Sequence, residues 1–98
     1  MGDDKISEKD LGNLITQLER VNGDKDRIRL VNAASDGFSF DCEQIKRLVD
    51  VVQYGDAVTT TAINLYGKCT DPDRYESVVL AALQFDEDRA TVKDAIGL

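Results

Sequence analysis

Acidic residues at three predicted helix starts are the first groups in this sequence that can do chemistry. Segments 24–27, 71–74 and 86–89 all have the form D-x-D-R. Carboxylates at this spacing can bind a metal ion or act as general acid and base. They equally suit the first turn of a helix, because they accept free amide protons while the Arg forms a local ion pair. Since the motif recurs at three places, we interpret it as helix capping and predict no catalytic residue.

A second candidate site is a calcium-binding loop at residues 32–43. Counted as an EF-hand loop, this segment has matching residues at positions 1, 5, 6 and 12, which are Asn32, Asp36, Gly37 and Glu43. Position 3 is Ala34, which has no ligand atom, and position 8 is the polar Ser39. The missing carboxylate lowers the expected calcium affinity by orders of magnitude. A degenerate EF-hand-like, calcium-responsive domain is therefore the alternative hypothesis, and no metal ligand is assigned.

The chain has two cysteines, Cys42 and Cys69, and no histidine. Without histidine, neither a Cys–His nucleophilic pair nor a Ser–His triad can form within the chain, and the usual zinc ligand spacings are missing. A disulfide is conceivable, but a reducing compartment keeps both thiols free. The seven glycines are dispersed, so there is no phosphate-binding loop. We therefore expect ordinary small residues at both positions, no cofactor and no enzymatic activity.

The charge balance excludes several classes of partner. The net charge is −7, with 19 acidic against 12 basic residues. Such a protein repels nucleic acid and anionic lipid at long range, so we expect neither as a partner. No apolar run is long enough to span a bilayer, and the polar start does not resemble a secretory signal, which favours a cytoplasmic location. A length of 98 residues predicts one domain over residues 1–98, with residues 1–6 disordered.

Regularly spaced aspartates indicate the elements that would position these groups. Successive aspartates at 41, 56, 71 and 86 are 15 residues apart, and each precedes apolar residues at helical spacing. Six short helices are predicted, starting at the caps Ser7, Asp24, Asp41, Asp56, Asp71 and Asp86. Four of them are expected to end at Gly23, Gly37, Gly55 and Gly67, and the last at Gly97. The short connections favour an all-α domain of antiparallel hairpins, arranged as a compact bundle or a short superhelix.

The start of the third predicted helix carries the strongest local signal. Asp41 and Gln44 have the spacing of a capping box, and Phe40 and Ile45 that of a hydrophobic staple. Aligning Asp41 with the aspartate at 71 superimposes apolar residues in both segments, which predicts a helical repeat of about 30 residues. Segment 38–40 alternates apolar and polar residues but is too short to predict a strand.

With these caps in place, the sequence resembles the family called domain of unknown function 4476. The residues that carry the resemblance are Phe40 with Gln44; Leu48, Val49 and Val52; Asp56 with Ala62, Leu65 and Tyr66; Asp71 and Pro72; and Phe85 with Asp86. The resemblance covers residues 24–96, and it departs from the family pattern at Tyr54 and Gly55. It implies helical architecture and assigns no catalytic residue.

The leading hypothesis is a non-enzymatic protein-interaction module whose acidic surface selects a basic or amphipathic partner. Aromatic residues are expected to fill gaps between helices, with exposed partner anchors as the alternative. An enzyme that uses carboxylates alone is a third hypothesis, and it requires two acidic side chains facing each other in a pocket.

Overall fold

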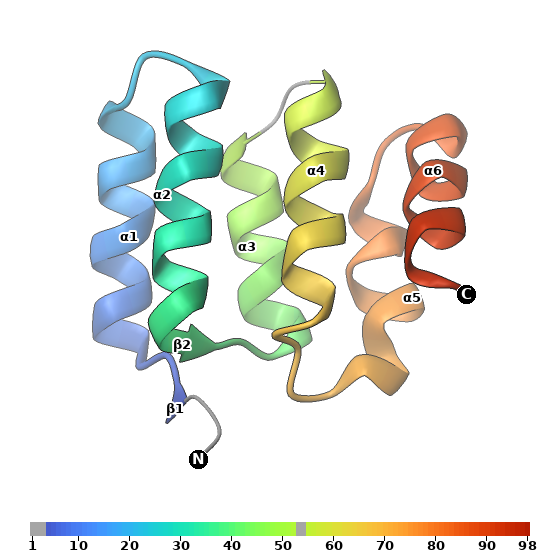
Figure 1. Ribbon diagram of the computed structural model, residues 1–98, viewed down its shortest axis with the longest axis horizontal. Coiled ribbons are helices and arrows are strands. Elements are labelled where there is room, and N and C mark those ends of the chain that lie inside the picture. Colours follow the sequence, from blue (N-terminus) through green and yellow to red (C-terminus); the bar gives the residue numbers. More distant parts are fainter. Residues whose placement is uncertain (1–3, 53–54) are drawn as a thin grey trace.

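A computed structural model describes residues 4–52 and 55–98, and within them the chain forms six α-helices joined by short elements (Figure 1). The helices are α1 (Glu8–Arg20), α2 (Asp24–Gly37), α3 (Cys42–Val52), α4 (Gly55–Tyr66), α5 (Tyr75–Val78) and α6 (Asp86–Ile96). Two 3₁₀ helices, η1 (Pro72–Arg74) and η2 (Leu80–Ala82), flank α5. None of the described helices is long and apolar enough to cross a membrane.

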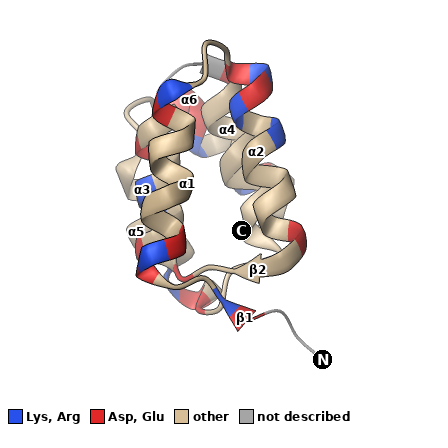
Figure 2. Cartoon of the chain, turned by 90° about the vertical axis from the view of Figure 1, so that its left-hand side faces the viewer, with Lys and Arg blue, Asp and Glu red and all other residues tan. Residues whose placement is uncertain are grey.

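The helices form three hairpins that stack side by side in two layers. Helix α3 packs between α1 and α5 in one layer, and α4 packs between α2 and α6. Seen from the side of the first hairpin, α1 and α3 lie opposite α2 and α4 (Figure 2). The extents of 34 × 31 × 17 Å match a flat slab about two helices thick. The prediction of an all-α fold built from antiparallel hairpins is confirmed.

The core lies between the layers and contains the apolar face of each helix. Helix α1 begins where Ser7 Oγ accepts a hydrogen bond of 3.1 Å from the Asp10 amide, as predicted for the cap. The fully buried large side chains are Leu11, Leu18, Val31, Phe40, Ile45, Leu48, Val52, Leu65, Tyr75, Val79, Leu80 and Val92. Their spacing within α1 and α3 is that of one helical face, which is why these two helices were predictable from the sequence.

Three of the predicted cap residues lie inside their helices instead. Asp24 and Asp86 are the first residues of α2 and α6, and the cap positions are occupied by Gly23 and Phe85. Neither helix start has a side-chain capping bond, because Gly23 and Phe85 have no side-chain acceptor. Each aspartate instead forms an ion pair with an Arg three residues later. Asp56 also lies inside its helix, since Gly55 begins α4 rather than ending α3.

The fifth predicted helix is broken into η1, α5 and η2. The predicted apolar face included Val78, but Val78 is only half-buried and Leu80 is buried instead. A 3₁₀ turn has three residues per turn, so it brings Leu80 and Leu83 to the same side. The change from α-helix to 3₁₀ helix after α5 thus buries both Leu80 and Leu83.

The N-terminal segment is part of the fold from residue 4 onwards. Strand β1 (Asp4–Lys5) pairs in parallel with β2 (Phe38–Ser39), and the Ile6 amide donates to the Ser39 carbonyl at 2.9 Å. Ile6 is 3% exposed, and its burial explains why residues 4–6 are ordered. The expectations of a disordered segment at these residues and of no strand are corrected, whereas residues 1–3 lie outside the described residues.

The aromatic residues mostly pack inside, as expected. Phe40 and Tyr75 are fully buried, and the Tyr75 ring meets Tyr66 edge to face with centroids 4.9 Å apart. Phe85 is the exception at 65% exposed. Tyr54, another aromatic at a predicted helix end, lies outside the described residues.

Candidate functional site

The N-terminus of α3 is held by two carboxylates from different parts of the chain. Asp41 accepts from the Gln44 amide at 2.8 Å, and Gln44 Oε1 accepts from the Asp41 amide at 3.0 Å, which confirms the predicted capping box. Asp71, which lies after α4, accepts from the Cys42 amide at 2.8 Å. Two amides of the first turn therefore have carboxylate acceptors, one local and one from the next hairpin.

The two thiols meet beside these carboxylates. Cys42 Sγ lies 3.4 Å from Cys69 Sγ and donates to the Asp71 carbonyl at 3.2 Å. Cys69 Sγ lies 3.5 Å from Asp71 Oδ1. Cys42 is fully buried, while Cys69 and Asp71 are partly exposed. Both cysteines are free thiols in this structure.

The stacking of hairpins explains why residues far apart in sequence come together here. Because α3 and α5 are neighbours in one layer, the connections that lead into them lie at the same end of the molecule, the lower end in Figure 1. The Phe40 amide donates to the Lys68 carbonyl at 2.9 Å, and the Thr70 amide donates to the Phe40 carbonyl at 2.8 Å. These two bonds hold the connections together and place Cys69 beside Cys42.

Burial and hydrogen bonding shift the pKa values of this cluster. Burial raises the pKa of the Cys42 thiol, and its hydrogen bonds to Cys69 and Asp71 raise it further. Burial also raises the pKa of Cys69, although hydrogen bonds from the Asp71 backbone and Cys42 partly oppose this. Burial alone would raise the pKa of Asp71, but hydrogen bonds from Cys42 and Cys69 and the charge of Arg74 lower it. At neutral pH the site therefore has two protonated thiols, which are poor nucleophiles, beside one carboxylate.

The donor atoms of this cluster can converge on one ion. Cys42 Sγ, Cys69 Sγ and an Asp71 carboxylate oxygen all lie within 4.8 Å of one another. Across residues 4–52 and 55–98 it is the one group of three or more Cys, Asp or Glu side chains close enough to share a metal. Thiolate and carboxylate together suit a borderline metal such as zinc.

The three D-x-D-R motifs do not meet in space as one site. In each motif the Arg pairs with the first aspartate, with nitrogen–oxygen distances of 2.9 Å for Arg27–Asp24 and 3.5 Å for Arg74–Asp71. Arg89 and Asp86 form the third pair. The local ion pairing is as expected. The predicted capping role is wrong for all three motifs, since α2, η1 and α6 all start without a side-chain capping bond. The Asp71 carboxylate instead accepts from the Cys42 amide at the start of α3.

The residues of the calcium hypothesis do not form a loop. Asn32 and Asp36 lie within α2, and Glu43 lies within α3 beyond the β2 turn. All three are exposed, and Asn32 Oδ1 accepts from the Asn64 amide group at 3.3 Å. In an EF-hand loop these residues wrap around one centre, whereas residues 32–37 are helical in this structure.

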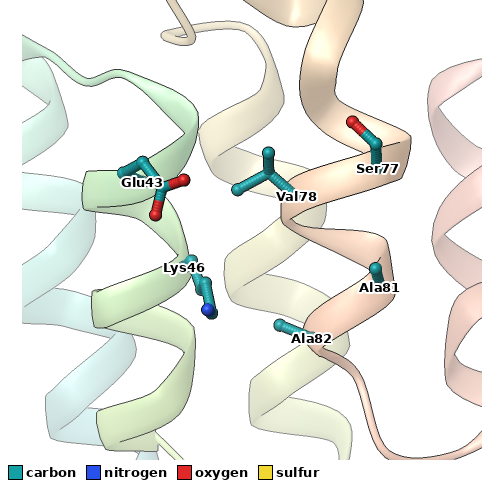
Figure 3. A pocket seen from close by; sticks show the side chains of 6 residues that line it. All are labelled: Glu43, Lys46, Ser77, Val78, Ala81 and Ala82. Carbon is teal, nitrogen blue, oxygen red and sulfur yellow. The ribbon is translucent and has the colours of Figure 1, made fainter.

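A shallow groove lies between α3 and the α5–η2 segment (Figure 3). Its volume is about 210 Å³, below the range of about 300–1,000 Å³ typical of small-molecule pockets. Side chains of mixed character line it, namely Glu43, Lys46, Ser77, Val78, Ala81 and Ala82. Glu43 and Lys46 reach from α3 towards Val78 and Ala82, so two charges face an apolar wall.

Sequence reasoning missed both the cysteine cluster and the groove. The signal for the cluster was present in the 30-residue repeat, which sets position 41 equivalent to position 71 in adjacent hairpins. Cys42 follows the first of these positions and Cys69 precedes the second, so stacking neighbours brings them together. A ligand set contributed by two neighbouring repeats contains neither His nor a CxxC spacing, so those sequence patterns do not indicate it.

Residues 5–96 match the family described as domain of unknown function 4476. Since this match covers nearly the whole chain, the protein belongs to that family, and the resemblance noted in the sequence is confirmed. No curated protein and no solved structure shows significant similarity to the chain.

Proposed function

We propose that this member of the domain of unknown function 4476 family is a non-enzymatic protein-interaction module. Its partner is an amphipathic peptide segment that carries basic residues. The observation that supports this is the α3–α5 groove, which has a small apolar wall beside charged groups. A groove of this size accommodates one or two apolar side chains of a partner rather than a cofactor.

The lining of the groove sets the chemistry of its occupant. Ala81 is exposed, and Val78 and Ala82 are half-buried, so an apolar side chain placed there would remove further apolar surface from water. Glu43 is exposed at the same groove and pairs with Arg74 only at 3.8 Å. Because exposed ion pairs of this length are weak, a Lys or Arg of the partner can compete for Glu43.

The charge of the whole chain favours the same class of partner. A net charge of −7 attracts basic segments at long range and raises their rate of association at low salt. Binding should therefore weaken as the ionic strength rises from about 0.05 M to about 0.5 M, since the Debye length shortens.

A peptide-display selection tests the proposal directly. The wild-type domain is used as bait, and binders are counter-selected on Ala81→Arg, which fills the groove with a bulky cation. Enriched peptides are expected to have a basic residue within one helical turn of a large apolar residue. Amide shifts of ¹⁵N-labelled protein should then map to α3, α5 and η2 when such a peptide is added.

The matched control is Ala33→Arg, because Ala33 is also an exposed helical alanine but lies on α2 in the other layer. It should bind the selected peptides as the wild type does. Selected peptides that fail to bind Ala33→Arg, shift changes confined to other elements, or a selection with no enrichment would each contradict the proposal.

A further inference from the structure

The distances in the cysteine cluster resemble the edges of a tetrahedral metal site. Zinc binds sulfur at about 2.3 Å and carboxylate oxygen at about 2.0 Å, so a tetrahedron sets two sulfurs about 3.8 Å apart and sulfur and oxygen about 3.5 Å apart. Here Cys42 Sγ and Cys69 Sγ are 3.4 Å apart, and Cys69 Sγ and Asp71 Oδ1 are 3.5 Å apart. The third pair, Cys42 Sγ and an Asp71 carboxylate oxygen, lies within 4.8 Å. All three donor atoms are therefore close enough to converge on one ion.

We propose that Cys42, Cys69 and Asp71 form a zinc-binding site that links the second and third hairpins. Cys42 comes from the start of α3, and the other two ligands come from the connection between α4 and η1. A disulfide would use the two sulfurs alone, whereas a metal ion also binds the Asp71 carboxylate, whose Oδ1 lies 3.5 Å from Cys69 Sγ.

The surroundings stabilise the charge of such a site. Two thiolates and one carboxylate exceed the charge of Zn²⁺ by one negative unit. Cys42 is the first residue of α3, where the positive end of the helix favours negative charge. Arg74 Nη1 lies 3.5 Å from Asp71 Oδ2, and the Cys42 amide donates to Asp71 Oδ1. These contacts orient the carboxylate, as outer-shell partners do at established zinc sites.

Metal binding displaces one proton from each thiol. Because both thiol ligands must lose their protons to bind, zinc affinity should rise with pH. Cys69 and Asp71 are partly exposed, so the ion can enter from their side and water can complete its coordination.

Cobalt titration under a phosphine reductant tests the site, because tetrahedral thiolate–cobalt complexes absorb visible and near-ultraviolet light. The reduced wild type is expected to bind one Co²⁺ with thiolate charge-transfer absorption, and Zn²⁺ should abolish the signal. Cys69→Ser and Cys42→Ser should lose this absorption, and Asp71→Asn should weaken binding at least tenfold. Asp73→Asn, an exposed acid on the same segment, is the matched control and should bind as the wild type does.

Thermal unfolding provides a second readout with the wild type alone, so the test does not depend on the folding of a variant. A hundredfold excess of Zn²⁺ over Kd should raise Tm by about 10 °C, and a chelator should reverse the rise. The proposal is overturned if reduced wild type binds no cobalt through thiolates, or if zinc leaves the Tm of the wild type unchanged.

Discussion

The starts of α3 and α6 have the same dipeptide, Phe-Asp, but use it differently. At α3, Phe40 is fully buried and Asp41 caps the helix through a reciprocal pair of hydrogen bonds with Gln44. At α6, Phe85 is 65% exposed and takes the cap position, while Asp86 lies inside the helix. One helix start is a buried junction of several segments, and the other is an exposed turn.

The residue three positions after the aspartate accounts for much of this difference. Gln44 can accept from the Asp41 amide, which completes a capping box. Arg89 has no acceptor atom, and it draws the Asp86 carboxylate into an ion pair. The same occurs with Arg27 at α2. Among these three helix starts, the one with D-x-x-Q is capped and the two with D-x-x-R are not.

The largest expected difference between the two starts comes from their aromatic residues. Phe40→Ala should lower the free energy of unfolding by about 3–5 kcal/mol, because it leaves a cavity at a fully buried position. Phe85→Ala should change it by less than about 0.5 kcal/mol, because most of that ring already contacts water. Urea unfolding followed by circular dichroism measures both. Similar losses in the two variants would contradict the assignment of α3 as the buried junction.

Replacing the aspartates at the two helix starts should lower stability in the same order, by smaller amounts. Asp41→Ala removes the acceptor of the Gln44 amide and the ion pair with Lys5, and should lower the free energy of unfolding by about 1–2 kcal/mol. Asp86→Ala removes only an exposed ion pair and should lower it by about 0.5 kcal/mol or less. The comparison is made by chemical unfolding at one pH and one salt concentration. An Asp86→Ala loss as large as that of Asp41→Ala would show that both carboxylates cap.

The smallest effect tests the role of the residue at the third position. Arg89→Gln turns D-x-x-R into D-x-x-Q at α6. The variant loses the ion pair with Asp86 and the hydrogen bond to the Leu83 carbonyl, and it gains the residue that a capping box needs. The two changes oppose each other, so the free energy of unfolding should move by about 0.5 kcal/mol or less. In the variant, the amide proton of residue 89 should respond to titration of Asp86 by NMR. An amide that does not respond would mean that the third residue does not decide the cap.

Much of the fold followed from local signals in the sequence. The α1 start at Ser7, the box of Asp41 and Gln44, and the left-handed Gly97 at the end of α6 all depend on contacts within about four residues. Contacts of this kind can be predicted from the spacing of residue types along the sequence. The apolar faces of α1 and α3 were equally plain, because both helices bury one side against a neighbouring layer.

The parts that failed depend on contacts between distant segments. Asp71 was expected to cap its own helix, but the neighbouring hairpin presents the Cys42 amide, and the carboxylate binds there. The order of residues 4–6 depends on β2 and on Gln44 Nε2, which donates to the Ile6 carbonyl at 3.0 Å. The candidate zinc site arises from the same side-by-side stacking of hairpins. Local spacing contains no information about which repeat lies beside which.

The central claim is that Asp41 and Asp71 both accept hydrogen bonds from the first turn of α3, which forms a junction between two hairpins. Its most direct test is the NMR signal of the Cys42 amide proton as a function of pH, in wild type and Asp71→Asn. The Asp71 pKa is lowered, so its contribution to stability is fully present above the unfolded value of about 3.9 and is lost as pH falls through the folded value. The amide should therefore resonate downfield and stay constant above about pH 4, then move only at lower pH, and the variant should show no such step. A Cys42 amide that exchanges freely, or that titrates identically in Asp71→Asn, would contradict the junction.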